Sequence, residues 1–449
     1  MNFNSLNFIF LFLPIFLAVY YCTPDRHRNL VLCLGSLAFY CIGTWKQPWC
    51  IALLLVLTCL TWLAGMALEK RGRSRGLLAA CLVVLFGALA GFKYAGLFGS
   101  SLVLPLGMSF YVFQMTAYLL DVYWSRIPVE SAFLSFSTGI LMFPKLLSGP
   151  LTRAEELQPQ VRKRRYSLEG FDQGLRDFLV GLALKVLLAD RVGGIWSQVK
   201  TIGFESISTP LAWMGLVAFS LQLYLDFCGY SWMAVGLGRM LGFHLPRNFD
   251  HPYAARSMSE FWRRWHITLG LWFRNYVYIP LGGNRKGLLR TVFNLLVVWL
   301  LTGMWHGAGW SFILWGLFLF LLIANEKLWL GKILERRPVL SRIYMLFAIL
   351  FSWMLFAIPD LGQIGVYLSR LFPFFGSGVA VSAGDFLRLG KQFGVFLVLG
   401  LVVSFPGPER LWNRIRTSVL GTILLFLLFW AVVYCLSVAT NDPFMYFSF

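Results

Sequence analysis

The residues of this chain best suited to acid–base chemistry are its five histidines, His27, His244, His251, His266 and His306. An imidazole has an unperturbed pKa of about 6.5, so a neutral histidine can take a proton from a hydroxyl near neutral pH. Three of them suit structural roles, because His27 stands in a basic loop and His244 and His251 flank a proline-containing turn. Chemistry is therefore expected first at His306, whose surroundings differ from theirs.

His306 is the strongest candidate because it lies in an apolar segment. Residues Val292–Ala324 contain no other acid–base side chain, and a titratable group at membrane depth is costly enough to be a functional candidate. Gly303, Gly307 and Gly309 permit a backbone break beside it. The segment exceeds the roughly 20 residues that one span needs, so a bend near His306 is expected. The alternative is a histidine that only hydrogen-bonds a neighbouring helix.

A buried histidine at this position suits acyl transfer to a hydroxyl. Burial disfavours the imidazolium, so the ring stays neutral and ready to accept a proton. The adjacent Trp305 would form an aromatic wall that excludes water, which protects an ester or thioester from hydrolysis. These features indicate a reaction type and leave the substrate open.

A second group of candidate site residues lies upstream of His306. Ser257 with Glu260 fits a capping box, so a helix is predicted to begin there. The residues that follow mix tryptophan, tyrosine and arginine, as in a helix at the membrane–water interface, and the alternative is a simple anchor for lipid headgroups. The turn Pro280–Lys286 has glycine amides and cations that could hold anionic phosphates.

The composition indicates that these residues belong to a membrane protein. Of the 449 residues, 58% are hydrophobic and 13% are charged, against about 25% charged in soluble domains. The excess apolar surface must therefore face lipid. The pattern predicts an all-α polytopic protein with about ten to thirteen transmembrane or re-entrant helices, in one domain spanning residues 1–449. The apolar runs are Leu6–Tyr21, Asn29–Trp45, Trp49–Leu68, Leu77–Phe98, Leu102–Leu120, Ala132–Leu147, Phe171–Leu188, Leu211–Leu241, Val292–Ala324, Ile343–Ile358, Phe393–Phe405 and Val419–Ser437.

The formal net charge of +19 is concentrated in short loops between the apolar runs. Such loops mark the cytoplasmic side of a membrane protein, and no soluble basic domain is present that could bind nucleic acid. With Arg26–Arg28, Lys70–Arg75 and Arg410–Arg416 in the cytoplasm, Met1 and Phe449 both lie outside. The eight cysteines include no C-x-x-C pair, and neither a metal site nor a bound cofactor is expected.

Three motifs carry a resemblance to a known family. They read FWRRWH at Phe261–His266, YIPLGGNR at Tyr278–Arg285 and GMWHGA at Gly303–Ala308. On these motifs the chain resembles the membrane-bound O-acyltransferase family over nearly its whole length, from the Pro14 region to Pro443–Phe449. It is most similar to the bacterial branch of that family, which includes subunits for alginate O-acetylation and for D-alanyl transfer to teichoic acid.

The resemblance implies a site and a reaction. His306 corresponds to the catalytic histidine and His266 to a second, assisting one, within a catalytic region of about residues 220–325. Helices would surround a central funnel or tunnel through which an acyl group, acetyl in the first instance, passes from a cytoplasmic acetyl-CoA or acyl-carrier-protein thioester. The candidate substrate-binding residues are Trp265, Arg263, Arg264, Trp305, Asn284 and Arg285.

The resemblance also implies a location and partners. The protein would lie in the bacterial inner membrane among lipids, with both termini in the periplasm. A periplasmic partner would complete O-acetylation of a secreted exopolysaccharide such as alginate or cellulose. The alternatives are D-alanyl transfer to a cell-envelope polymer, a transporter or flippase of a polysaccharide precursor, and a non-catalytic scaffold.

Three positions depart from the pattern of the family. Trp232 and Asn275 stand where an aspartate is expected, and Lys145 stands where glutamine is usual after Phe143–Pro144. These departures bear on the details of the acceptor, and both histidines are intact.

Overall fold

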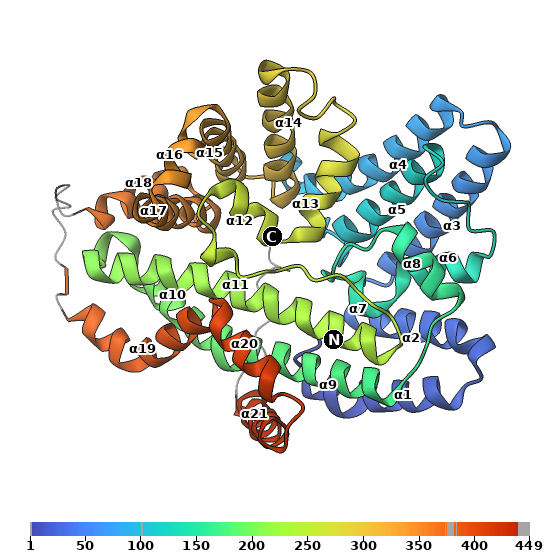
Figure 1. Cartoon of the computed structure of the whole chain (residues 1–449), viewed down its shortest axis with the longest axis horizontal. Coiled ribbons are helices and arrows are strands. Elements are labelled where there is room, and N and C mark those ends of the chain that lie inside the picture. The colour runs from blue at the N-terminus through green and yellow to red at the C-terminus, as the bar shows by residue number, and fades with distance from the viewer. Residues whose placement is uncertain (1, 100–101, 373, 375–380, 383, 439–449) are drawn as a thin grey trace. The chain divides into compact units, whose positions relative to one another are not determined.

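All regular elements of the described chain are helices. The computed structural model describes residues 2–99, 102–372, 374, 381–382 and 384–438, and no strand occurs among them (Figure 1). The all-α fold class predicted from the apolar runs is therefore confirmed. Met1 and the C-terminal motif Pro443–Phe449 lie outside the described residues, and with them the predicted location of the two termini.

The helices divide between two compact units, and the boundaries fall within α9, α11 and α21 and between Arg247 and Asn248. Residues up to Leu182 together with Tyr230–Arg247 form most of the first unit, which contains α1 (Leu13–Cys22), α2 (Arg28–Gly43), α3 (Trp49–Lys70), α4 (Arg75–Lys93), α5 (Met108–Tyr123), α6 (Phe133–Leu141), α7 (Phe143–Leu146), α8 (Ala154–Arg162) and most of α9 (Leu168–Ala183).

The second unit consists mainly of Ala183–Gly229 and Asn248–Cys435. Its helices are α10 (Asp190–Ile202), most of α11 (Thr209–Met240), α12 (Met258–Arg264), α13 (Ile267–Phe273), α14 (Leu288–His306), α15 (Trp310–Asn325), α16 (Gly331–Arg336), α17 (Pro338–Ala357), α18 (Leu361–Leu371), α19 (Asp385–Val403), α20 (Pro406–Ile415) and α21 (Val419–Val438). Short π-helical turns at Phe8–Phe12, Leu184–Ala189, Arg274–Tyr278 and Glu326–Leu330, and 3-10 turns at Asp25–His27, Ala95–Phe98, Phe204–Ser206 and Pro252–Ala254, complete the described helical elements. The prediction of a single domain stays a prediction.

Eight helices of the described chain are long and apolar enough to cross a membrane. They are Trp49–Lys70, Arg75–Lys93, Thr209–Met240, Leu288–His306, Trp310–Arg336, Pro338–Ala357, Asp385–Val403 and Val419–Val438. The chain is thus a polytopic membrane protein, with fewer full-length crossings than the ten to thirteen predicted spans and re-entrant helices. The difference lies in short apolar helices such as α5, whose 16 residues extend about 24 Å against a hydrocarbon core of about 30 Å.

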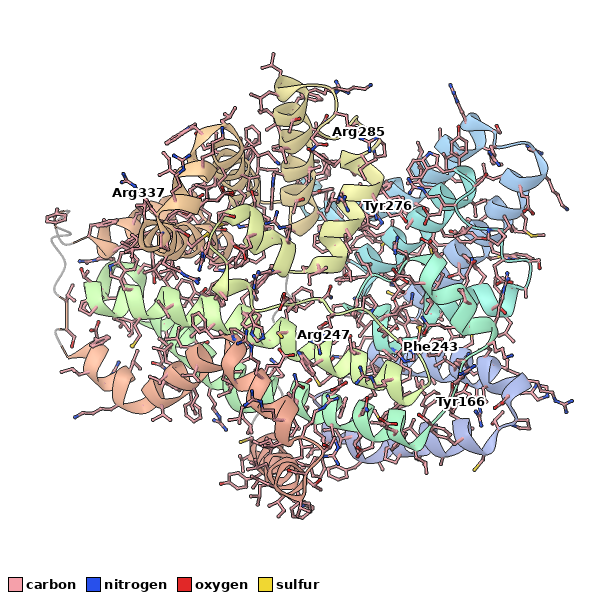
Figure 2. All side chains as sticks on the ribbon, in the orientation of Figure 1. Tyr166, Phe243, Arg247, Tyr276, Arg285 and Arg337 are labelled. Carbon is pink, nitrogen blue, oxygen red and sulfur yellow. The ribbon has the colours of Figure 1, made fainter. Side chains whose placement is uncertain are left out.

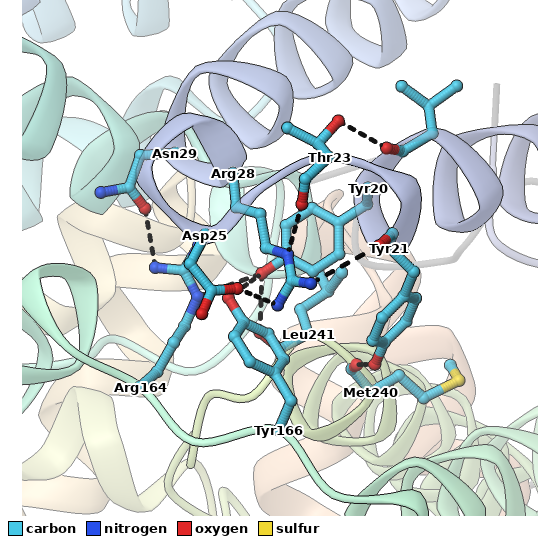
Figure 3. Close-up of polar contacts among 11 residues, drawn as sticks. Tyr20, Tyr21, Thr23, Asp25, Arg28, Asn29, Arg164, Tyr166, Met240 and Leu241 are labelled. Atoms are coloured by element: carbon cyan, nitrogen blue, oxygen red, sulfur yellow. Dashed lines mark hydrogen bonds and ion pairs between the residues drawn. The ribbon is translucent and has the colours of Figure 1, made fainter.

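Polar contacts fix α1 within the first unit (Figure 3). The hydroxyl of Tyr20 donates to the Leu241 carbonyl at 2.9 Å and lies 2.9 Å from the hydroxyl of Tyr166. The guanidinium of Arg164 donates to the hydroxyl oxygen of Tyr20 at 3.0 Å and to the side-chain oxygen of Asn29 at 2.7 Å. The basic segment after α8 therefore holds the ends of α1 and α2 and the residue after α11 in one network.

A buried ion cluster joins α10 and α11 in the second unit. The ammonium of Lys185 lies 2.6 Å from a carboxylate oxygen of Asp226 and 2.6 Å from one of Asp190. The side chains of Lys185 and Asp226 are 3% and 2% exposed. Burial alone would lower the pKa of Lys185, but the two carboxylates raise it above its ordinary value.

Helices α14 and α15 form a hairpin that breaks at Gly307–Gly309, immediately after His306. The predicted bend near this histidine is therefore confirmed. The two helices approach closely, because a Cβ atom added to Gly303 would lie 2.5 Å from the Phe312 carbonyl oxygen. In the same way, a Cβ atom on Gly316 would lie 2.5 Å from the Trp299 carbonyl oxygen.

We expect Gly303→Ala to destabilise the protein by about 1–3 kcal/mol, because the new methyl group overpacks a backbone contact that cannot yield without moving a helix. Thermal melting of the detergent-purified protein measures this. Gly309→Ala is the matched control, since a Cβ atom there meets only ordinary contacts, the nearest at 3.6 Å. Equal melting temperatures for the two variants would contradict the close helix approach.

Candidate active site

Helix α12 begins at the predicted capping box and is fixed from outside by a buried carboxylate. The Ser257 hydroxyl oxygen accepts from the backbone N–H of Glu260 at 3.1 Å, which confirms the predicted helix start. The carboxylate of Glu326, which follows α15, accepts from the backbone N–H groups of Met258 at 2.6 Å and Ser259 at 2.8 Å. A negative charge at a helix N-terminus is favourable, so this contact joins α12 to the hairpin that carries His306.

His266 is held in an unusual backbone conformation between α12 and α13. Its φ of 43° lies in the left-handed region, which costs free energy for a residue with a side chain. The Asn248 side-chain oxygen accepts from the Thr268 hydroxyl at 2.6 Å and backbone N–H at 3.2 Å, and lies 3.4 Å from Nδ1 of His266. Because that oxygen can only accept, Nδ1 is the donor in this contact.

The imidazole of His266 is almost fully enclosed. Its residue is 3% exposed, and the ring meets Phe227 edge-to-face at 4.8 Å and Trp305 at 6.4 Å between centroids. Burial lowers the pKa of His266 to about 3, because the cation loses its hydration. The ring is therefore neutral at physiological pH, with Nδ1 protonated and Nε2 the basic nitrogen.

His306 is the last residue of α14 and is packed among aromatic rings. It is 8% exposed, and its ring lies 4.7 Å from Trp305, 5.0 Å from Trp315 and 5.1 Å from Phe356 between centroids. The edge-to-face arrangement fixes the orientation of the imidazole. Trp305 thus lies beside both histidines, and its predicted role as a wall that excludes water stays a prediction.

The two histidines line one cavity of about 360 Å³, a volume in the range of small-molecule sites. The cavity is bounded by α12, α13, α14 and α15 and by the turns that follow α13 and α15. These helices lie in the upper part of Figure 1. Its buried walls include Trp265, Trp299 and Thr302. Three exposed cations also line it, Arg263, Arg274 and Lys327. An apolar interior with a cationic rim suits a ligand that carries an apolar acyl end and an anionic body.

The other predicted substrate-binding residues lie outside this cavity. Arg264 pairs with Glu260 of its own helix at 2.6 Å. Asn284 and Arg285 lie in the exposed loop before α14 (Figure 2). The backbone of that loop is held to α14, because the Asn294 side chain donates to the Gly283 carbonyl at 2.9 Å. Trp305 also does not line the cavity. A role in substrate binding stays a prediction for all six residues, including Trp265 and Arg263, which do line it.

Four features of the site were missing from the sequence-based prediction. Arg274 and Lys327 supply two of the rim cations, Asn248 orients His266, and Glu326 fixes α12. One signal in the sequence could have pointed to Glu326 and Lys327. They are two consecutive charged residues at the end of the long apolar run that contains His306. Within the described residues, no group of three or more metal-ligating side chains occurs.

Comparisons with known proteins agree with the motifs. Residues 125–362 match the membrane-bound O-acyltransferase family. The chain is 33% identical to a probable alginate O-acetylase AlgI of Pseudomonas putida over 100% of both chains. It is 37% identical to the Pseudomonas fluorescens protein of the same name, over 83% of this chain and 76% of the other. A peptidoglycan O-acetyltransferase of Helicobacter pylori is 33% identical over 70% of this chain and 68% of the other.

Proposed function

Because the chain belongs to the membrane-bound O-acyltransferase family, we propose that it takes an acetyl group from a cytoplasmic thioester for O-acetylation of a secreted exopolysaccharide. The observation that carries this proposal is the single cavity lined by both His306 and His266, with cations at its rim. The relatives named above are called O-acetylases or O-acetyltransferases of alginate and of peptidoglycan, which supports acetyl as the acyl group and a polysaccharide as the final acceptor.

In the proposed reaction His306 is the general base. Its imidazole takes the proton of an acceptor hydroxyl, and the hydroxyl oxygen attacks the thioester carbonyl. The carbon–sulfur bond then breaks, and the imidazolium returns the proton to the departing sulfur, which leaves as the thiol. His266 assists through its unprotonated Nε2, which can accept a hydrogen bond, while Nδ1 donates to the side chain of Asn248. The aromatic residues around His306 keep water from competing with the acceptor hydroxyl.

The cations at the rim favour an anionic donor. Both acetyl-CoA and an acyl-carrier-protein thioester carry phosphate, and Arg263, Arg274 and Lys327 would attract either one. In this proposal the donor reaches the cavity from the cytoplasm across the bacterial inner membrane, and a periplasmic partner delivers the acetyl group to alginate, cellulose or a related polymer.

Consumption of the donor by purified protein tests the proposal. The detergent-solubilised chain is incubated with acetyl-CoA or with acetylated carrier protein, and released thiol is measured with and without a hydroxyl acceptor. Acceptor-dependent thiol release supports acetyl transfer. No consumption of either donor, with consumption of a D-alanyl thioester instead, would assign the chain to D-alanyl transfer, whereas a transporter or scaffold would consume none of them.

We expect Arg263→Gln to raise the KM for the thioester donor about two- to fivefold with little change in kcat, since an exposed ion pair contributes at most about 1 kcal/mol. Arg264→Gln is the matched control, because Arg264 pairs with Glu260 and does not line the cavity. The KM of the wild type should also rise with ionic strength. Equal KM values for wild type and Arg263→Gln at low salt would contradict a role of this cation in donor binding.

A further inference from the structure

A second cavity lies in the first unit, around the lysine that departs from the family pattern. Lys145 belongs to the four-residue helix α7, which is enclosed by close backbone contacts. A Cβ atom on Gly149 would lie 2.4 Å from the Cα atom of Lys145, and one on Gly107 would lie 2.6 Å from the Leu146 carbonyl oxygen. The chain before and after α7 therefore fixes the position of Lys145.

The ammonium of Lys145 is buried among neutral partners. The residue is 1% exposed, and its Nζ donates to the side-chain oxygen of Gln114 and, at 3.0 Å, to the hydroxyl oxygen of Thr152. An ammonium has three N–H donors, so one remains for a further partner. The carboxylate of Glu130, whose backbone N–H donates to the hydroxyl of Tyr118, is paired with Arg162 at 2.9 Å.

The space beside this ammonium is a cavity of about 40 Å³, enough for about three water-sized groups. It lies between α5, α6 and α8, which pack together at the right of Figure 1. Lys145 and Gln114 are its buried polar side chains, and α6 and α8 contribute half-buried residues. The lining residues are Gln114, Tyr118, Ser135, Phe136, Gly139, Ile140, Lys145, Thr152, Ala154, Leu157, Gln158 and Val161.

The chemistry of the lining favours a small anion. Lys145 is the one charged side chain in it, and Tyr118 is its other titratable group. The Gln114 side-chain nitrogen is buried and has no hydrogen-bond partner among the described residues. The remaining walls are largely apolar. A buried ammonium without a counter-ion is costly, and burial accordingly lowers the pKa of Lys145 to about 7.

We propose that this cavity binds a small monovalent anion, chloride or a carboxylate no larger than acetate, between the Nζ of Lys145 and the side-chain nitrogen of Gln114. The anion supplies a negative charge to balance the ammonium of Lys145. The two N–H donors match the oxygens of a carboxylate, and the apolar walls match a short alkyl group. The site is independent of the histidine cavity and of the proposed acetyl transfer.

Thermal melting of the detergent-purified full chain at constant ionic strength tests the site. Sodium acetate, sodium chloride and sodium gluconate are compared, the last as an anion too large to enter. We expect acetate or chloride to raise the Tm saturably by about 2–5 °C, with no such rise in gluconate. A response to acetate alone identifies a carboxylate site, and a response to both identifies a general small-anion site.

Lys145→Gln is the decisive variant, because it removes the charge and keeps a hydrogen-bond donor. It should lose the anion-dependent rise in Tm. In the wild type, the apparent affinity for the anion should fall about tenfold between pH 6 and pH 8, since a group with a pKa of about 7 loses its proton over that range. This measurement uses only the wild type, so it tests the proposal even if the Lys145→Gln variant does not fold. Equal stabilisation by gluconate, persistence in Lys145→Gln or a pH-independent affinity would overturn the proposal.

Discussion

Replacement of His306 by alanine is expected to remove O-acetylation while the protein is still made and inserted. Loss of a general base lowers a rate by about 10²- to 10⁴-fold, which takes the acetyl content of the secreted exopolysaccharide below detection. The measurement is acetyl ester per unit of polymer, with the membrane level of the protein followed by immunoblot. Since the ring of His306 packs against Trp315 and Phe356, the alanine variant also loses some stability.

His306→Gln separates the two effects. Glutamine fills much of the same space and can hydrogen-bond, but it cannot take a proton near neutral pH. We expect it to melt close to the wild type and to be as inactive as the alanine variant. His27→Ala serves as the control, because His27 lies exposed between α1 and α2. Normal acetylation by His306→Gln at a normal protein level would make this residue structural and place the base elsewhere.

The second large effect is expected at the buried ion cluster of Lys185. Lys185→Met leaves the carboxylates of Asp226 and Asp190 without the ammonium that lies 2.6 Å from each. Breaking a buried ion pair by removing one partner costs about 3–5 kcal/mol, because the remaining charge stays desolvated. We expect a fall in the melting temperature of the purified protein of about 5–10 °C.

The double variant Lys185→Met with Asp226→Asn tests the reason for that loss. It removes the buried negative charge as well as the positive one, so part of the stability should return. Asp190, whose side chain is 23% exposed, can be hydrated where it stands. Asp226→Asn alone is measured as well. If the loss of stability in the double variant equals the sum of the losses in the two single variants, the residues act independently. The buried ion cluster would then not be the cause of the loss in Lys185→Met.

The sequence was most informative where the length of an apolar run or the spacing of two residues permits few local structures. The apolar run around His306 is too long for one span, and three glycines mark where it can bend, so the break after α14 could be predicted. The start of α12 followed from Ser257 and Glu260, because a capping box is a local interaction within four residues. Both predictions depend on the chain near the residue concerned.

The parts of the site that could not be predicted depend on packing between distant segments. Asn248 reaches His266 across 18 residues and Glu326 reaches Met258 across 68, and neither pairing leaves a pattern in one sequence. Arg263 and Arg264 are neighbours, and adjacent residues of a helix point in different directions. Only the packing of α12 decides that Arg263 lines the cavity and Arg264 pairs along the helix.

The carboxylate of Glu326 has a consequence for how catalysis is distributed over the second unit. It holds two backbone N–H groups of α12, while the glycine contacts lock α14 against α15. The arginine that would meet the donor and the histidine that would take the proton thus belong to one stiff assembly. In the proposed reaction, groups that are held in place before the donor binds would lower the barrier without a cost of reorganisation.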